Sequence, residues 1–233
     1  MSFVRIAHQH IAEALASMDA ERLMRDRCYF GGGTAIVLQN GEYRQSLDVD
    51  FLCADIDGYR NLRASAAMDG AGAFFGPEAR TRRDFRIDQY GLRTIIDWHG
   101  QPIKFEIIRE ARIALDGAID PALGVPVLLA DDQVAEKLLA NADRCFDRSV
   151  AYRDALDLGV LAAVHGGVFP AQAVAKAERA YGADVRSKAM AAAERLSDVA
   201  EIRHAATTLD MQPARALSAA KAFAGAVAAT WTA

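Results

Sequence analysis

Features that mark several specialised protein classes are missing from this chain of 233 residues. Its three cysteines, Cys28, Cys53 and Cys145, are widely spaced and form no Cys-x-x-Cys pair. This spacing argues against a disulfide framework or a zinc site, and it predicts reduced thiols in a cytosol. The five histidines have no ligand spacing with cysteines or acidic residues, so we assign them no role.

Long apolar segments are also missing. No uninterrupted apolar run approaches the roughly 20 residues that a membrane-spanning helix needs. The N-terminal segment is amphipathic and charged throughout, without the continuous apolar core of a signal peptide. A net charge of −4 argues against a chain that is basic throughout, although it leaves room for a local basic patch. We therefore expect a cytoplasmic protein with no membrane partner.

Hydrophobic periodicity predicts a helix near the N-terminus. Residues 3–27 carry apolar side chains at near-helical intervals, and the glycines Gly31–Gly33 follow them and stop the helix. Thr34 is a candidate N-cap for a short apolar helix over residues 35–40, which Gly41 could terminate.

The remaining segments define the fold class. Residues 56–76 predict a helix that glycines interrupt, and residues 84–97 and 102–109 predict two strands joined by the turn HGQP. The second half has helical periodicity, and no Pro-, Gly- or Ser-rich linker marks a boundary. We therefore expect an α+β fold, with an N-terminal mixed sheet flanked by helices and then an all-helical region. The expected domains are residues 1–115 and 116–233.

Two carboxylates interrupt the most strand-like run of the chain, SLDVDFLC. Alternation places Leu47, Val49 and Phe51 on one face of the strand, and Asp48 and Asp50 on the other. Two neighbouring carboxylates repel unless a cation lies between them or one is protonated. The pair therefore suits Mg²⁺, which prefers oxygen ligands beside phosphates. The alternative is a solvated strand face without function.

A third carboxylate on an adjacent strand would complete such a magnesium site. Glu106 is the first candidate, because it alternates with apolar neighbours on its own strand and shares a face with Lys104. Asp97 is the second candidate.

A glycine cluster precedes the carboxylates. Glycines at a helix start let backbone N–H groups approach a phosphate closely, and Thr34 adds a hydroxyl. No Gly-Lys-Ser/Thr follows, so this is not a Walker A loop, and a plain turn is the alternative. Gly-Thr followed by Asp-x-Asp is more specific than either part, because one element would hold a triphosphate and the other its metal.

These residues carry a resemblance to a known superfamily. The run FGGGTAIVLQNGEYRQSLDVDFL is similar to the signature of DNA polymerase β-like nucleotidyltransferases, a Gly-Gly/Ser helix start followed by Asp-x-Asp. Its fuller form, Gly-Gly-Thr-Ala with Arg44 and Ser46 just before Asp-x-Asp-Phe, resembles the AbiEii/AbiGii toxin branch. Thr34 stands where the superfamily more often has Ser.

The resemblance extends into the second half. The branch has Lys-Leu-x-Ala-x-x-x-Arg and then a segment close to Arg-x-x-Asp-Leu-x-Asp-Leu, and this chain has EKLLANADRCFDR and YRDALDLGVL. The match covers most of residues 30–160, and residues 165–233 add no motif. It implies that Lys137 and Asp154 complete the active site. Lys137 would neutralise triphosphate charge as a mobile cation, and Asp154 would orient it or position the acceptor.

Nearby residues have two interpretations. Asp154 and Asp157 are three apart on the expected helix and would share a face. Three arginines would contact nucleotide or RNA phosphates, or else form surface ion pairs with neighbouring aspartates: Arg144, Arg148 and Arg153.

The expected function is a Mg²⁺-dependent nucleotidyltransferase that acts on an NTP. Asp48, Asp50 and Glu106 would bind the metal, and Gly32, Gly33 and Thr34 would hold the β- and γ-phosphates. The resemblance implies a toxin of a type IV-like toxin–antitoxin pair, with tRNA or protein as acceptor and a cognate antitoxin as partner. The alternatives are a non-catalytic nucleotide- or partner-binding module on the same fold, and a metal-dependent phosphohydrolase.

Overall fold

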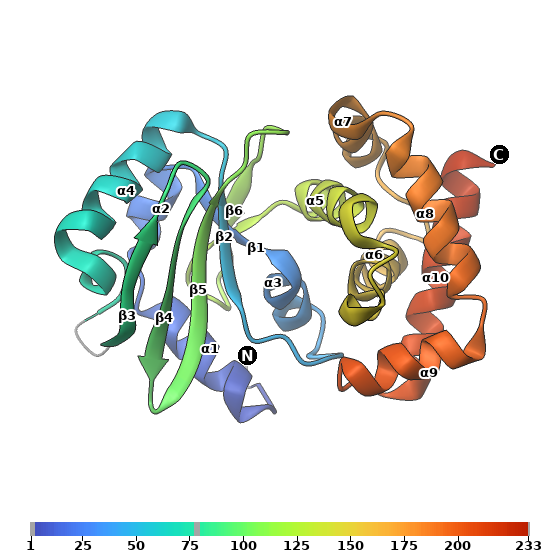
Figure 1. Ribbon diagram of the computed structural model, residues 1–233, viewed down its shortest axis with the longest axis horizontal. Coiled ribbons are helices and arrows are strands. Elements are labelled where there is room, and N and C mark those ends of the chain that lie inside the picture. Colours follow the sequence, from blue (N-terminus) through green and yellow to red (C-terminus); the bar gives the residue numbers. More distant parts are fainter. Residues whose placement is uncertain (1–2, 77–79, 233) are drawn as a thin grey trace. The chain divides into compact units, whose positions relative to one another are not determined.

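The computed structural model describes residues 3–76 and 80–232 (Figure 1). The chain forms two compact units. The first comprises Met1–Leu38 and Ser46–Leu129, and the second comprises Gln39–Gln45 and Ala130–Ala233. The short segment 39–45 therefore belongs to the second unit, although it is flanked on both sides by parts of the first.

A mixed sheet forms the centre of the first unit, with strand order β3-β4-β5-β2-β1-β7-β6 in the described residues. Strand β2 runs parallel to β5 and antiparallel to β1, while β1 runs parallel to β7. The strand bounds are β1 Cys28–Gly31, β2 Val49–Cys53, β3 Arg80–Ile87, β4 Gly91–Trp98, β5 Gln101–Arg109, β6 Gly117–Ile119 and β7 Pro126–Leu128.

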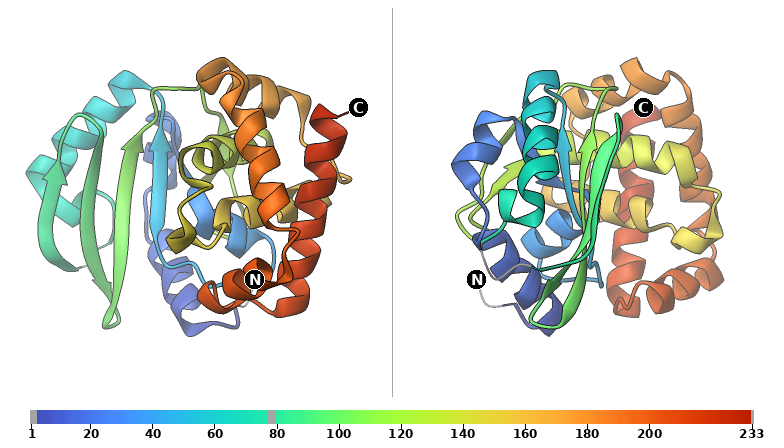
Figure 2. Two further views of the ribbon diagram at one scale, coloured as in Figure 1. Left: turned by 45° about the vertical axis from the view of Figure 1, so that its right-hand side comes forward. Right: turned by 60° about the vertical axis from the view of Figure 1, so that its left-hand side comes forward.

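Helices of the first unit bury one face of this sheet. Their bounds are α1 Ile6–Ala16, α2 Ala20–Arg25, α3 Gly32–Gln39 and α4 Ile56–Asp69, followed by the 3-10 turn η1 Gly70–Ala73. Figure 2 shows α4 running alongside the strands. Leu62 of α4 packs in one core with Phe51, Leu92 and Phe105, which all point to the same side of the sheet. The opposite face of the central strands carries Asp50 and Glu106, next to a smaller apolar cluster that contains Tyr29, Leu52 and Leu128.

Two predicted elements of the first unit are each split in the structure. The helix expected over residues 3–27 is α1 and α2, because the Asp19 carboxylate accepts the Arg22 N–H at 3.0 Å and starts a new helix. The strand expected over residues 84–97 is the end of β3 and the whole of β4. A turn separates them, in which Asp88 Oδ1 accepts the N–H groups of Tyr90 and Gly91.

The second unit is helical, as the sequence predicts. Its helices are α5 Ala130–Arg144, α6 Arg153–Val164, α7 Ala171–Tyr181, α8 Asp184–Arg195, α9 Val199–Thr208 and α10 Pro213–Trp231, with the 3-10 turn η2 Arg148–Val150. Helices α6 and α10 approach closely at Gly159, where a Cβ atom would lie 2.0 Å from the carbonyl oxygen of Ala219. In the described part of the chain, no helix combines the length and hydropathy that a membrane crossing requires.

Candidate active site

The carboxylate face of β2 lies opposite the core. Val49 and Phe51 are buried, whereas Asp50 between them is only partly covered. Asp48 directly precedes β2 and is also partly covered. The predicted alternation is confirmed for Val49, Asp50 and Phe51. Leu47 and Asp48 precede the strand, and the prediction that Leu47 shares the apolar face is wrong, because its side chain is 37% exposed.

The strand pairing of the sheet places Glu106 beside Asp50. Strands β2 and β5 are parallel neighbours, and their register pairs Asp50 with Glu106. Directly paired residues point to the same face of a sheet, about 5 Å apart. Asp97 is opposite Pro102 and Arg80 instead, and its carboxylate accepts a hydrogen bond from Arg82 at 2.8 Å. The register therefore puts Glu106, and not Asp97, next to Asp50.

Basic side chains already surround Glu106. Arg93 Nε lies 3.1 Å from one carboxylate oxygen, and Lys104 Nζ lies 2.8 Å from the other. Burial alone would lower the pKa of Lys104, but its hydrogen bond to Glu106 and the charges of Glu106, Asp48 and Asp50 raise it. The pKa of Lys104 is therefore raised by all three carboxylates of the predicted metal site.

The start of α3 lies directly against Asp50. Gly32 has a φ of +68°, and a Cβ atom there would lie 2.9 Å from Asp50 Oδ2. Gly31 pairs with Asp50 across β1 and β2, and a Cβ on Gly31 would lie 2.5 Å from a side-chain carbon of Leu52. A side chain at Gly32 would press on Asp50 and would require a left-handed backbone, so Gly32 is the glycine that permits this close approach.

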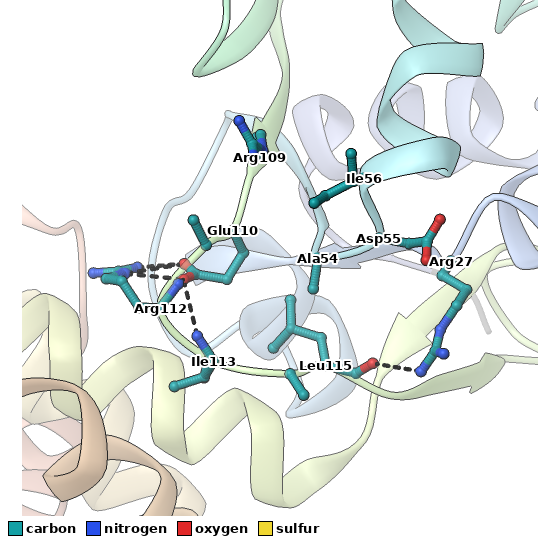
Figure 3. A pocket seen from close by; sticks show the side chains of 11 residues that line it. Arg27, Ala54, Asp55, Ile56, Arg109, Glu110, Arg112, Ile113 and Leu115 are labelled. Carbon is teal, nitrogen blue, oxygen red and sulfur yellow. Dashed lines mark hydrogen bonds and ion pairs between the residues drawn. The ribbon is translucent and has the colours of Figure 1, made fainter.

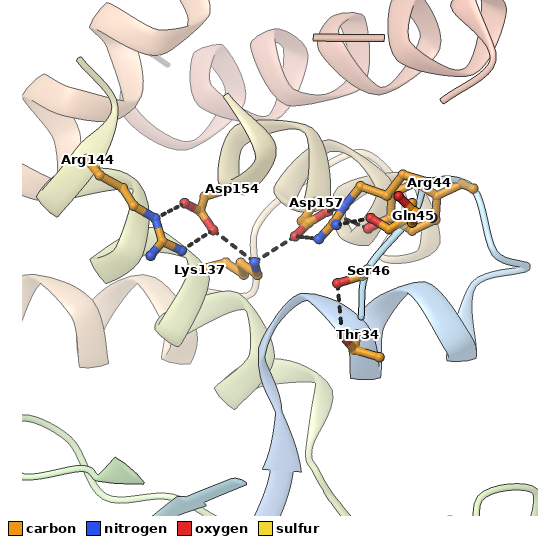
Figure 4. Close-up of polar contacts among 9 residues, drawn as sticks. Thr34, Arg44, Gln45, Ser46, Lys137, Arg144, Asp154 and Asp157 are labelled. Carbon is orange, nitrogen blue, oxygen red and sulfur yellow. Dashed lines mark hydrogen bonds and ion pairs between the residues drawn. The ribbon is translucent and has the colours of Figure 1, made fainter. Parts of the chain in front are cut away.

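Thr34 has a different role from the predicted N-cap. Helix α3 begins at Gly32, which places Thr34 inside the first turn. Its side chain is buried, and its Oγ1 lies 2.8 Å from Ser46 Oγ in a hydrogen bond (Figure 4). The bond joins the glycine-rich helix start to the segment that leads into Asp48 and Asp50.

In the second unit, Lys137 lies between two aspartates of α6 (Figure 4). Its Nζ is 2.8 Å from Asp154 Oδ1 and 2.6 Å from Asp157 Oδ2. The two aspartates share a helix face, as predicted, and Asp154 is placed to orient Lys137. The expectation of a mobile lysine is wrong for this structure, because Lys137 is buried and held by two carboxylates.

Two arginines extend this buried cluster. Arg44 donates to Asp157 through Nε at 2.7 Å and Nη2 at 2.8 Å, and Tyr43 donates to the same carboxylate. Arg144 donates twice to Asp154, at 2.6 and 2.9 Å. Arg44 was recognisable as a motif residue in the sequence, but its pairing with Asp157 was not predictable, since 113 residues separate the two.

The cluster fixes the charge of its aspartates. Burial alone would raise the pKa of both carboxyls, but Lys137 and Arg144 hold the pKa of Asp154 well below its usual value. Arg44 and Lys137 lower the pKa of Asp157. Arg144 thus forms an ion pair with Asp154, but inside a buried cluster and not at the surface. Arg148 forms an ion pair at 3.0 Å with Glu201 instead of a neighbouring aspartate.

A pocket of about 390 Å³ in the first unit contains none of these residues (Figure 3). Its walls are Arg27 and residues 54–56 and 109–115. The acidic side chains of the pocket already have partners, since Asp55 accepts a hydrogen bond from the Gly58 N–H and Glu110 forms an ion pair with Arg112. The pocket follows the last residue of β2, whereas Asp48 precedes the first, so the pocket is not the predicted nucleotide site.

One family model matches residues 13–228 of the chain, and its description is nucleotidyl transferase AbiEii toxin, type IV toxin–antitoxin system. The chain belongs to the AbiEii family. This AbiEii-family protein is therefore a nucleotidyltransferase of a type IV toxin–antitoxin system. The family implies an NTP as substrate and a cognate antitoxin.

Solved structures share the fold over nearly the whole AbiEii-family chain. A protein of H. pylori assigned as a nucleotidyltransferase has a TM-score of 0.57 at 18% identity, over 96% of this chain and 94% of its own. JHP933 from Helicobacter pylori has a TM-score of 0.54 at 19% identity, over 95% and 92%. An antigenic nucleotidyltransferase-like protein from Paracoccidioides brasiliensis has a TM-score of 0.51 at 12% identity, over 88% and 93%. No curated protein matches the chain significantly.

Proposed function

We propose that the AbiEii-family protein transfers an NMP group from an NTP to a hydroxyl of an RNA acceptor such as tRNA, and that it requires Mg²⁺. The observation that supports this most directly is the contact between Gly32 and Asp50. It places the N-terminus of α3, which favours anions, beside a carboxylate that suits a cation. A triphosphate with its metal ion needs an anion-binding group and a cation-binding group side by side.

The donor set fits a magnesium ion. Asp48 and Asp50 offer hard oxygen ligands, and Mg²⁺ is commonly held by one or two carboxylates together with substrate phosphates. Within residues 3–76 and 80–232, no three acidic, histidine or cysteine side chains are grouped closely enough to hold a metal by themselves. We therefore assign the metal to the two aspartates and the substrate phosphates, with Glu106 as a further ligand when Arg93 and Lys104 release it.

The phosphates would be bound by backbone groups. The first N–H groups of α3, at Gly32, Gly33 and Thr34, have no partner inside the helix and would donate to the β- and γ-phosphates. Thr34 contributes through its backbone and through the Ser46 bond that holds the helix start, since its hydroxyl is already engaged. Lys137 and Asp154 would complete the site as a preset pair, with the lysine amino group fixed by Asp154 and Asp157.

The transfer is an in-line substitution at the α-phosphate. The acceptor oxygen forms a bond to the α-phosphorus, the bond from that phosphorus to the bridging oxygen breaks, and pyrophosphate leaves. The hydroxyl proton passes to solvent. A bound metal would stabilise charge on the attacking and leaving oxygens. The chain's own residues orient the triphosphate and hold the carboxylates next to it, which is the positioning part of catalysis.

The test is incubation of the purified protein with each α-labelled NTP, Mg²⁺, total tRNA and a protein mixture. Label in RNA supports the proposal, and loss of that label in EDTA supports the metal requirement. Label in protein alone would replace RNA with a protein acceptor. Free NMP without labelled macromolecule would indicate a phosphohydrolase, and stabilisation by NTP without any turnover would indicate a binding module.

A further inference from the structure

The carboxylates of the proposed site belong to a row of charged residues that crosses the sheet. Register pairs Asp50 with Glu106, Glu106 with Arg93, and Arg93 with Arg86. Directly paired residues share a face, so these four side chains lie in line on four adjacent strands. The row is acidic on β2 and β5 and basic on β4 and β3.

The basic end of this row lies on an exposed edge strand. Strand β3 is the last in the sheet order and carries four arginines and one acidic residue among eight residues. Arg86 is 80% exposed. Arg83 is paired with Ile95, two residues along β4 from Arg93 and on the same face. Ion pairs neutralise part of this charge, since Arg82 contacts Asp97, and both Arg86 and Arg93 contact Asp88. The basic character is local in a chain with net charge −4.

We propose that three arginines at the basic end, Arg83, Arg86 and Arg93, bind the phosphodiester backbone of the polynucleotide acceptor and lead it to Asp50. Neighbouring strands are about 5 Å apart, so the row from β3 to β2 spans about 15 Å. Successive phosphates of one strand rise about 3.4 Å in a duplex, so this length accommodates several phosphates. Arginine matches phosphate oxygens with paired N–H donors. This inference rests on the proposed transfer to a nucleic acid.

A structural alternative exists for arginines on an edge strand. Charged side chains at a sheet edge prevent pairing with another chain and need no ligand. Edge protection is satisfied by charge at any position along β3. The register, however, places Arg86 and Arg93 on the same face as the carboxylates and in line with them. The alignment favours a substrate surface, and the two roles separate by experiment.

The experiment measures binding of labelled total tRNA to the full chain in EDTA, where no transfer occurs. Arg83→Glu/Arg86→Glu is compared with Arg60→Glu/Arg63→Glu, which makes the same change in net charge. Arg60 and Arg63 lie on α4, whose Tyr59 and Leu62 pack against the opposite face of the sheet. We expect the β3 variant to raise the Kd at least about tenfold, and to reduce the slope of log K against log salt by about one to two. The α4 variant should bind as the wild type does.

A second variant, Arg83→Gln/Arg86→Gln, should show a smaller loss in the same direction. Unchanged tRNA affinity in both β3 variants, with circular dichroism like that of the wild type, would overturn the inference. Aggregation of the β3 variants with normal affinity of the remaining monomer would assign the arginines to edge protection instead.

Failure of this inference differs from failure of the proposed function. If the wild type labels tRNA and the β3 variants label it with unchanged KM, the surface is wrong and the function stands. If the wild type consumes no NTP but its tRNA binding depends on Arg83 and Arg86, the surface stands and the function is wrong.

Discussion

Gly32 lies so close to Asp50 that a side chain at position 32 would displace the Asp50 carboxylate. A Cβ atom there would lie 2.9 Å from Asp50 Oδ2 and 3.3 Å from Asp50 Cβ. Gly32 also has a φ of +68°, which non-glycine residues adopt at a cost. The contact joins two motifs that lie apart in the sequence, the glycine cluster and the Asp-x-Asp pair.

Gly32→Ala should abolish nucleotide binding, because the methyl group would displace the Asp50 carboxylate. Gly41→Ala is the matched control, since Gly41 has a φ of +77° and open space around its Cβ position. Both variants should lose about 1–2 kcal/mol of unfolding free energy from the backbone strain. Equilibrium dialysis with Mg²⁺ and ATP should show binding in Gly41→Ala alone. Equal binding by both variants would contradict the assigned role of the contact.

The Thr34–Ser46 hydrogen bond should be measurable as a coupling energy. Thr34→Val and Ser46→Ala should each cost about 0.5–1.5 kcal/mol in urea unfolding. The double variant should cost less than the sum, because both single changes remove the same bond. Thr34→Ser keeps the hydroxyl and should retain most of the activity. Strict additivity would show that the bond does not hold the helix start.

Lys137→Met tests whether Lys137 is held between the carboxylates of Asp154 and Asp157. The change leaves Asp154 and Asp157 facing each other with one cation fewer, and it should cost about 3–5 kcal/mol of unfolding free energy. Lys221→Met, at an exposed position of α10, is the control and should change stability little. A Lys137 variant with wild-type stability and a raised KM for NTP would instead indicate a free lysine that meets the nucleotide directly.

The same cluster predicts a stability change in acid. The folded-state pKa of Asp154 is lowered, so its contribution is complete above the unfolded pKa of about 3.9 and is lost as pH falls through the folded value. Asp154→Asn should therefore be strongly destabilised at pH 7, and the gap to the wild type should narrow below about pH 4. Urea unfolding between pH 7 and pH 2.5 measures the gap. Asp57→Asn, from an exposed pair with Arg60, should show almost none.

The sequence predicted elements whose pattern is local. Alternation around Val49 and Phe51 identified β2 and its polar face, and helical periodicity identified the helical second half. It could not predict β6 and β7, since three residues are too few for periodicity. It also missed the division at Asp19, where one capping carboxylate competes with a continuous helical pattern.

The candidate site shows the same limit. Asp48, Asp50 and the glycines were recognisable because the glycine cluster and the Asp-x-Asp pair are each a short local motif. The placement of Glu106 beside Asp50 depends on which strands pair, and the contact of Arg44 with Asp157 depends on how segment 39–45 packs against α6. Long-range pairings of this kind leave no pattern in a single sequence. The ion pair of Glu106 with Arg93 was unpredictable for the same reason, whereas strand alternation already placed Lys104 on the face of Glu106.

The most direct test of the account is transfer of label from α-labelled NTP to tRNA by Asp50→Asn and Asp97→Asn. The two changes are chemically identical, and both residues lie on the sheet of the first unit, but only Asp50 lies against the start of α3. The account predicts that Asp97→Asn stays within a few-fold of the wild type. Asp50→Asn should lose at least about 10²–10³-fold in rate, the scale of losing one group that stabilises transition-state charge. Comparable activity in the two variants, or greater loss in Asp97→Asn, would contradict it.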